Sequence, residues 1–121
     1  MLLISRLECA VAGQRRGVRL LPGTITASAY GSQETAEEFR CNFGLNPEYR
    51  EQVEKGGLQV TGLDENGEVR IVELRGHLFF VATLFLPQHS SHPGAPHPLF
   101  LAFVKAAAAF PPTRASRIGA A

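Results

Sequence analysis

An apolar run at residues 79–88 constrains the fold more than any other part of this sequence. The run is rich in aromatic and β-branched residues, and it stops at a proline followed by a polar residue. Such a run predicts a strand that is buried on both faces of an α/β sheet. Ligands of open α/β sheets bind beyond the carboxyl ends of the strands, so Leu86, Pro87 and Gln88 occupy the place where a site is expected. Chemically, these three side chains can do little.

The composition is that of one soluble domain. The chain has 121 residues, 45% of them hydrophobic and 19% charged, with a formal net charge of +1. This balance gives no electrostatic reason to expect nucleic acid or an anionic membrane as a partner. No apolar run is long enough to span a bilayer, and Arg6 and Glu8 interrupt the start too early for a signal peptide. We therefore expect a cytoplasmic protein.

Cysteine usage and loop motifs indicate no cofactor. The two cysteines, Cys9 and Cys41, form no C-x-x-C pair, which favours a reduced cytosolic protein with buried thiols. The glycines at residues 13–17 lack the spacing of a phosphate-binding loop and read better as a basic turn. The sequence predicts no bound cofactor.

The region before residue 45 is expected to be mostly strand and loop. Residues 2–11 and 18–21 resemble strands and are predicted to form a hairpin. Residues 24–38 are small and polar, which favours a loop with one helical turn. Residues 39–43 are predicted to form a short strand.

A helix is predicted to begin at Asn46-Pro47-Glu48. Asparagine can cap the free amides, proline at the first position has no amide to leave unpaired, and glutamate favours the positive end of the helix dipole. Gly56 and Gly57 should end this helix. A hairpin of residues 58–63 and 68–74 should follow, because Asn66-Gly67 between two strand-like runs is the strongest short-range hairpin signal.

The last helix is predicted to open at Pro98 and to end before the prolines at 111–112. Its apolar face is expected to carry Leu99, Phe103, Ala106 and Phe110. The tail, residues 113–121, is expected to be disordered.

Two side-chain groups suggest chemistry, and each has a plainer interpretation. His89, His92 and His97 lack the spacing of a helical metal-binding pair, so a surface loop is favoured over a metal site. Cys41 follows Arg40, which could lower the pKa of the thiol, but no glycines flank it as in a nucleophile elbow. A buried, inert cysteine is the favoured interpretation, and a reactive thiol stays open.

One resemblance covers residues 23–110. It depends on many positions in order, namely Asn46-Pro47-Glu48-Tyr49-Arg50-Glu51-Gln52, Gly57-Leu58, Gly62, Val72-Glu73-Leu74, His77, Phe80-Val81-Ala82, Pro96-His97-Pro98-Leu99-Phe100 and Phe103-Val104-Lys105-Ala106-Ala107. Together they resemble the second half of the C-terminal class I glutamine amidotransferase domain of CTP synthase. The likeness is strongest to the short proteins related to that C-terminal region.

The resemblance implies a fold and an ancestral chemistry. The fold would be α/β, a partial three-layer, flavodoxin-like amidotransferase domain with a mixed sheet, one hairpin and two main helices. Residues 1–112 would form this half-domain. In the family, a cysteine in a Gly-x-Cys-x-Gly elbow attacks glutamine, a Phe-His-Pro-Glu motif supplies the histidine and glutamate of the triad, and the released ammonia aminates UTP.

When the family's catalytic residues are aligned with this sequence one by one, none of them is found. The family histidine falls on Leu86, which cannot accept a proton, and the family glutamate falls on Gln88, which is neutral. Neither cysteine lies in an elbow, so the resemblance implies no catalytic residue. The family's Arg-His-Arg stretch near the glutamine pocket falls on Arg40, Cys41 and Asn42. These three residues, with Leu86 and Gln88, form the candidate pocket.

Three functions remain open. The first is an amidotransferase-like protein that is inactive alone and binds a ligand or a protein. The second is a subunit that completes a glutaminase site with a separate chain, to which Cys41 or Gln88 contributes. The third is an interaction module. An incomplete sheet leaves an exposed edge, so we expect a homo-oligomer or a complex with a separately encoded first half of the domain.

Overall fold

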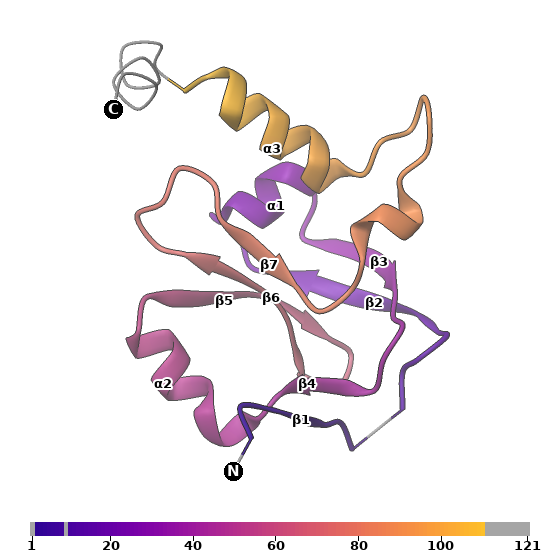
Figure 1. Ribbon diagram of the computed structural model, residues 1–121, viewed down its shortest axis with the longest axis vertical. Coiled ribbons are helices and arrows are strands. Elements are labelled where there is room, and N and C mark those ends of the chain that lie inside the picture. The colour runs from indigo at the N-terminus through magenta and orange to yellow at the C-terminus, as the bar shows by residue number, and fades with distance from the viewer. Residues whose placement is uncertain (1, 9, 111–121) are drawn as a thin grey trace, which may run out of the picture.

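A computed structural model describes residues 2–8 and 10–110 of the chain (Figure 1). Cys9 and the predicted disordered tail, residues 113–121, lie outside the described residues. The elements in order are β1 (Ile4–Arg6), β2 (Arg15–Leu20), α1 (Ile25–Tyr30), β3 (Glu34–Glu38), β4 (Phe43–Leu45), the 3-10 turn η1 (Pro47–Tyr49), α2 (Arg50–Lys55), β5 (Leu58–Asp64), β6 (Val69–Leu74), β7 (Val81–Thr83), the 3-10 turn η2 (Pro87–Ser90) and α3 (Pro98–Ala108).

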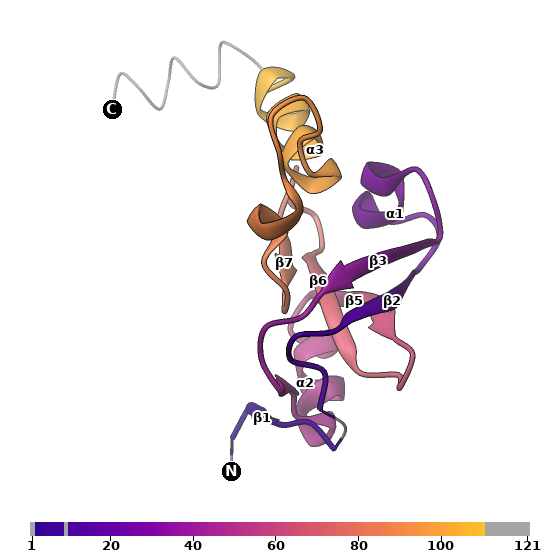
Figure 2. The same cartoon turned by 90° about the vertical axis from the view of Figure 1, so that its right-hand side faces the viewer.

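The described strands form two sheets. A five-stranded sheet has the order β3-β2-β5-β6-β7, and β1 pairs with β4 in a small ribbon. Every pairing is antiparallel. Both views place α1 and α3 together at one end of the molecule, with α2 and the β1–β4 ribbon at the other (Figures 1 and 2). The predicted α/β class is confirmed, but the expected mixed sheet is wrong, because the described sheets are antiparallel throughout.

The predicted hairpin is confirmed as β5 and β6. Asp64 fixes the turn because its Oδ1 accepts hydrogen bonds from the backbone N–H of Asn66 at 2.9 Å and of Glu68 at 3.0 Å. Gly67 has a positive φ of 78°, which residues with a Cβ rarely adopt. The asparagine–glycine pair predicted the turn because glycine readily adopts the positive φ that this position requires.

The two predicted helix starts are also confirmed. The side chain of Asn46 accepts a hydrogen bond from the N–H of Glu48 at 3.1 Å, and Pro47 opens η1, which leads into α2. α2 ends at Lys55, before the predicted glycines. α3 begins at Pro98 with His97 as its cap.

The strand predicted at residues 79–88 is wrong in length and position. β7 comprises only Val81–Thr83, and it is the last strand of the sheet rather than a central one. Ala82 is exposed, and Phe80 is 43% exposed. The run is apolar although one side of β7 has no neighbouring strand among the described residues, so apolar character alone did not indicate a central position.

The predicted N-terminal hairpin is wrong as well. β1 pairs with β4, whereas β2 lies between β3 and β5. The helical turn expected within residues 24–38 is present as the short helix α1, but residues 34–38 form β3 rather than a loop. Opposite charges favour this pairing: two glutamates of β3 lie opposite two arginines of β2, Glu38 opposite Arg15 and Glu34 opposite Arg19.

The strand expected at residues 39–43 lies slightly later, as β4. Phe39 instead continues the pairing of β3 through hydrogen bonds with Gly13 and Gln14, and its side chain enters the core. The main core cluster joins both ends of the chain; it consists of Leu7, Val11, Val18, Leu20, Phe39, Ile71, Phe85 and Leu99. Of the predicted apolar face of α3, only Leu99 is buried, and Phe103 is 51% exposed. Cys41 is exposed too, so the expectation of a buried thiol is wrong for this residue.

Candidate functional site

The five candidate pocket residues come from two chain segments that leave the core side by side. Phe39 and Phe85 pack edge to face with their ring centroids 6.0 Å apart. Arg40 follows the first ring and Leu86 follows the second. The core contact therefore brings the start of both segments to the same region, at the end of β3 nearest η2.

The first segment has structural roles for two of its three residues. The Nη2 atom of Arg40 lies 2.8 Å from Glu38 Oε1 in an ion pair that is about half exposed, so solvent screens it. The Oδ1 atom of Asn42 accepts hydrogen bonds from the backbone N–H of Val11 and of Ala12, both at 2.8 Å. Asn42 thus holds the turn before β2 rather than facing a ligand.

Cys41 differs from its neighbours because its thiol is exposed, with Sγ 4.0 Å from the carbonyl oxygen of Phe43. None of its hydrogen-bond partners among the described residues is a base. Neither candidate residue of the second segment is a base: Leu86 is 43% exposed, Gln88 is exposed, and the Leu86 carbonyl accepts the His89 N–H of η2. The five residues contain an exposed thiol and a guanidinium but no group that could take a proton from the thiol near neutral pH.

A buried polar cluster of Tyr30, Glu37 and His97 lies close by, and the sequence interpretation missed it. His97 Nε2 lies 2.8 Å from Glu37 Oε2 and 3.1 Å from Oε1, and the Tyr30 hydroxyl donates to Oε2 at 3.0 Å. The other ring nitrogen, His97 Nδ1, accepts the Leu99 backbone N–H at 3.1 Å. An accepting Nδ1 assigns the proton to Nε2, which therefore donates to Glu37.

This cluster fixes α3 and offers no open site. Glu37 and His97 are 2% and 3% exposed. Burial, then the charge of Glu37 and its hydrogen bond, raise the pKa of the Tyr30 hydroxyl far above its usual value. The signal for His97 was its place before Pro98, where a capping side chain belongs. His89 and His92 are exposed, and the described residues contain no group of side chains arranged to hold a metal ion.

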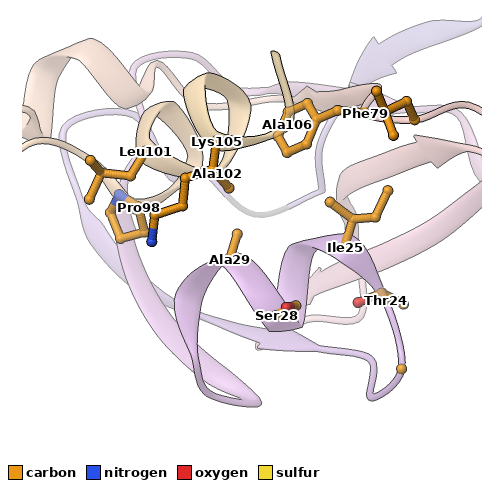
Figure 3. A pocket seen from close by; sticks show the side chains of 12 residues that line it. Thr24, Ile25, Ser28, Ala29, Phe79, Pro98, Leu101, Ala102, Lys105 and Ala106 are labelled. Carbon is orange, nitrogen blue, oxygen red and sulfur yellow. The ribbon is translucent and has the colours of Figure 1, made fainter. Parts of the chain in front are cut away.

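A groove of about 730 Å³ lies between α1 and α3. Figure 3 shows Ile25 and Ala29 of α1 facing Leu101 and Ala106 of α3 across it. Its walls are mainly apolar, and among the described residues that line it Lys105 alone carries a charge. None of the five candidate pocket residues lines this groove. Its chemistry suits apolar packing rather than a reaction.

Comparison with known proteins decides the relationship. No protein-family model matches the chain. The CTP synthase of Sulfurisphaera tokodaii is 42% identical over 86 residues, which is 71% of this chain and 16% of that protein. The CTP synthase of Chloroflexus aggregans is 44% identical over 90 residues, 74% of this chain and again 16% of that protein. In structure, the chain matches the glutaminase domain of Trypanosoma brucei CTP synthase, solved with bound acivicin, with a TM-score of 0.79 and 26% identity.

The chain is related to the glutaminase domain of CTP synthase. The match covers 88% of this chain and 46% of the Trypanosoma domain, so the chain corresponds to slightly less than half of that fold. The expected amidotransferase-like fold is confirmed. The chain spans about 16% of the length of the curated relatives that it matches. None of the helices in the described part of the chain has the length and apolar character needed to cross a bilayer.

Proposed function

We propose that this chain is a CTP synthase-related, glutamine amidotransferase-like protein that lacks the Cys-His-Glu triad and is catalytically inactive alone. Its role would be to bind a protein or a small ligand in the cytoplasm. The relationship to a glutaminase domain supports the amidotransferase-like part of this proposal. The proposal rests on the pair Leu86 and Gln88, which the sequence resemblance aligns with the family histidine and glutamate.

The chemical argument is direct. Glutamine hydrolysis through a thioester needs a base that activates the thiol and later activates water. A leucine side chain has no lone pair, and a glutamine amide carries no charge with which to stabilise an imidazolium. Cys41 has no base among its hydrogen-bond partners in the described residues. Loss of a triad typically leaves at most ~10³-fold acceleration over water.

The experiment measures ammonia release from glutamine by the purified chain. We expect no turnover above background, and no difference between the wild-type chain and Cys41→Ser. Turnover at an enzymatic rate that Cys41→Ser abolishes would refute the proposal. A thermal-shift screen with glutamine, UTP and CTP then separates ligand binding from pure protein binding, because a ligand of the native state raises the melting temperature.

The exposure of Cys41 supports a second candidate, a subunit that completes a glutaminase site together with another chain. In that case Cys41 or Gln88 would contribute in trans. Ammonia release that appears only on mixing with the partner, and that falls on Cys41→Ser, would favour this candidate. For either function we propose that the chain works as a homo-oligomer or with a separately encoded first half of the domain.

A further inference from the structure

The free edge of β7 is the first part of an unoccupied surface. β7 ends the five-stranded sheet, and its only described strand partner is β6 (Figure 1). A free strand edge presents unpaired backbone groups that can pair with another chain. Natural proteins protect such edges with charges or proline, whereas residues 78–84 contain neither. This edge is unprotected by its own sequence.

The hydrogen-bond pattern shows which backbone groups point outward. Leu84 N–H donates to Arg70 O at 2.9 Å, and Leu74 N–H donates to Phe80 O at 3.2 Å. Antiparallel pairs alternate between bonded and non-bonded residues, so Ala82 is bonded to β6. Val81 and Thr83 therefore direct their N–H and C=O groups away from β6, toward the open edge.

Helix α3 is the second part of the surface, and it is apolar on all sides. Leu99 points into the core, and Leu101 faces the groove. Phe100, Leu101, Phe103 and Val104 are nevertheless between 40% and 64% exposed. A helix that is apolar all round is normally buried on all sides.

Contacts join the two parts. Phe79, which lies just before β7, packs edge to face against Phe103 of α3 with centroids 5.7 Å apart. Phe79 and Leu78 also line the groove with Leu101. We define the β7–α3 surface as the edge of β7 together with the exposed side chains of Leu78, Phe80, Phe100, Leu101, Phe103 and Val104. Several exposed apolar side chains on neighbouring elements are typical of an interaction site.

We propose that the β7–α3 surface binds a separately encoded first half of a class I glutamine amidotransferase domain, which adds a strand to β7 and covers α3. This inference rests on the proposed function, because it names the partner. The chain matches only 46% of a glutaminase domain, so the rest of that domain is the body that fits beside this half. A second copy fits less well: two α3 helices would bring two Lys105 side chains together, and α3 contains no carboxylate to pair with them.

The probe is the first half of the glutaminase domain of Chloroflexus aggregans CTP synthase, the part before the residues that match this chain. It is co-expressed with the full chain, and the mass of the product is measured by size-exclusion chromatography with light scattering. We expect a one-to-one complex. Thr83→Pro should weaken it at least ~10-fold, because proline removes an outward N–H without removing a bond to β6.

The matched control is Ala36→Pro on β3, the opposite edge of the same sheet. Leu20 N–H donates to Gln33 O and Phe39 N–H to Gln14 O, so the same alternation directs the Ala36 N–H outward. Ala36→Pro should leave the complex intact. Val104→Glu, at a side chain 64% exposed, adds a charge to the surface with little cost to the fold and should also abolish binding.

Each outcome decides the proposal. A first half that stays insoluble or unbound in the presence of the chain overturns it. A complex that survives both Thr83→Pro and Val104→Glu shows that the partner binds elsewhere. A chain that already dimerises alone, and that Val104→Glu converts to a monomer, assigns the surface to a second copy. Glutamine turnover by the chain alone would refute the proposed function without changing the mass of the complex, so the two failures are distinguishable.

Discussion

The imidazole of His97 donates from Nε2 to the Glu37 carboxylate at 2.8 Å, inside a core where both side chains are only 3% exposed. The bond joins the cap of α3 to strand β3, two elements far apart in the sequence. Because the same ring caps α3 through Nδ1, one side chain determines both where the helix starts and where it is anchored.

The two hydrogen bonds of His97, one to Glu37 and one that caps α3, should contribute separately to the free energy of unfolding. His97→Asn keeps an acceptor for the Leu99 N–H but loses the bond to Glu37, whereas His97→Ala loses both. We expect Asn to cost about 2 kcal/mol of unfolding free energy and Ala about 1 kcal/mol more, measured by urea denaturation. Glu38→Ala, next to Glu37 but half exposed, should change stability by less than about 1 kcal/mol. Equal costs for Asn and Ala would contradict the capping role.

Because the Tyr30 hydroxyl is buried beside Glu37, the free energy of unfolding should fall as the pH rises into the alkaline range. The pKa of this hydroxyl is raised in the folded state by burial and by Glu37, so the folded protein keeps a proton that the unfolded chain releases near pH 10. The contribution is full below about pH 10 and is lost as pH rises further. In an absorbance titration at alkaline pH, the difference between the wild-type chain and Tyr30→Phe should show Tyr30 ionising only as the protein unfolds. Tyr30→Phe should flatten the fall in stability above this pH. Ionisation of Tyr30 in the folded protein near pH 10 would contradict the assignment.

The parts of the fold that were predictable from sequence depend on short-range chemistry. Asn66-Gly67 and Asn46-Pro47 encode their structures within a few residues, through a positive φ and a capping hydrogen bond. The parts that failed depend on distant partners. The 24–38 segment reads as a loop because nothing local indicates that Glu73, on β6, accepts hydrogen bonds from the first amides of α1 at 3.2 and 2.7 Å.

The candidate site shows the same division. Sequence resemblance identified Leu86 and Gln88 as positions of interest, and both are exposed beside the end of β3. It could not foresee that Asn42 is occupied by the amides of Val11 and Ala12, because that contact joins residues about 30 apart. The strand at 79–88 was misjudged for a related reason: an apolar run has the same composition whether its neighbours belong to its own chain or to a partner.

Arg70 and Asp64 form a buried ion pair, and replacing one of them should cost more unfolding free energy than replacing the other. Arg70 Nε lies 2.9 Å from Asp64 Oδ2, the guanidinium stacks 4.7 Å from the ring centroid of Phe39, and Arg70 is fully buried. Among the described residues, Arg70 Nη2 has no hydrogen-bond partner. Asp64→Asn leaves a buried guanidinium that cannot lose its proton and should cost about 3 kcal/mol. Arg70→Met leaves the Asp64 carboxylate, which still accepts hydrogen bonds from the Asn66 and Glu68 N–H groups, so it should cost less. The double variant should resemble Arg70→Met. Urea denaturation of the four proteins measures this cycle, and a larger cost for Arg70→Met would contradict it.

Restoring the missing groups should create activity only in the presence of the first half. Leu86→His with Gln88→Glu places a base and a carboxylate at the positions that the proposed function assigns to the family histidine and glutamate. The same proposal places the family nucleophile in the separately encoded first half. The double variant mixed with the first half of the Chloroflexus aggregans domain should release ammonia from glutamine, ~10²-fold or more above the wild-type mixture. The double variant alone should stay inactive, and adding Thr83→Pro should remove the gain by blocking docking. Leu86→His alone should give less activity, because the imidazole then lacks its orienting carboxylate. An unchanged rate in a mixture that demonstrably forms the complex would show that Leu86 and Gln88 do not occupy the positions of the lost catalytic pair.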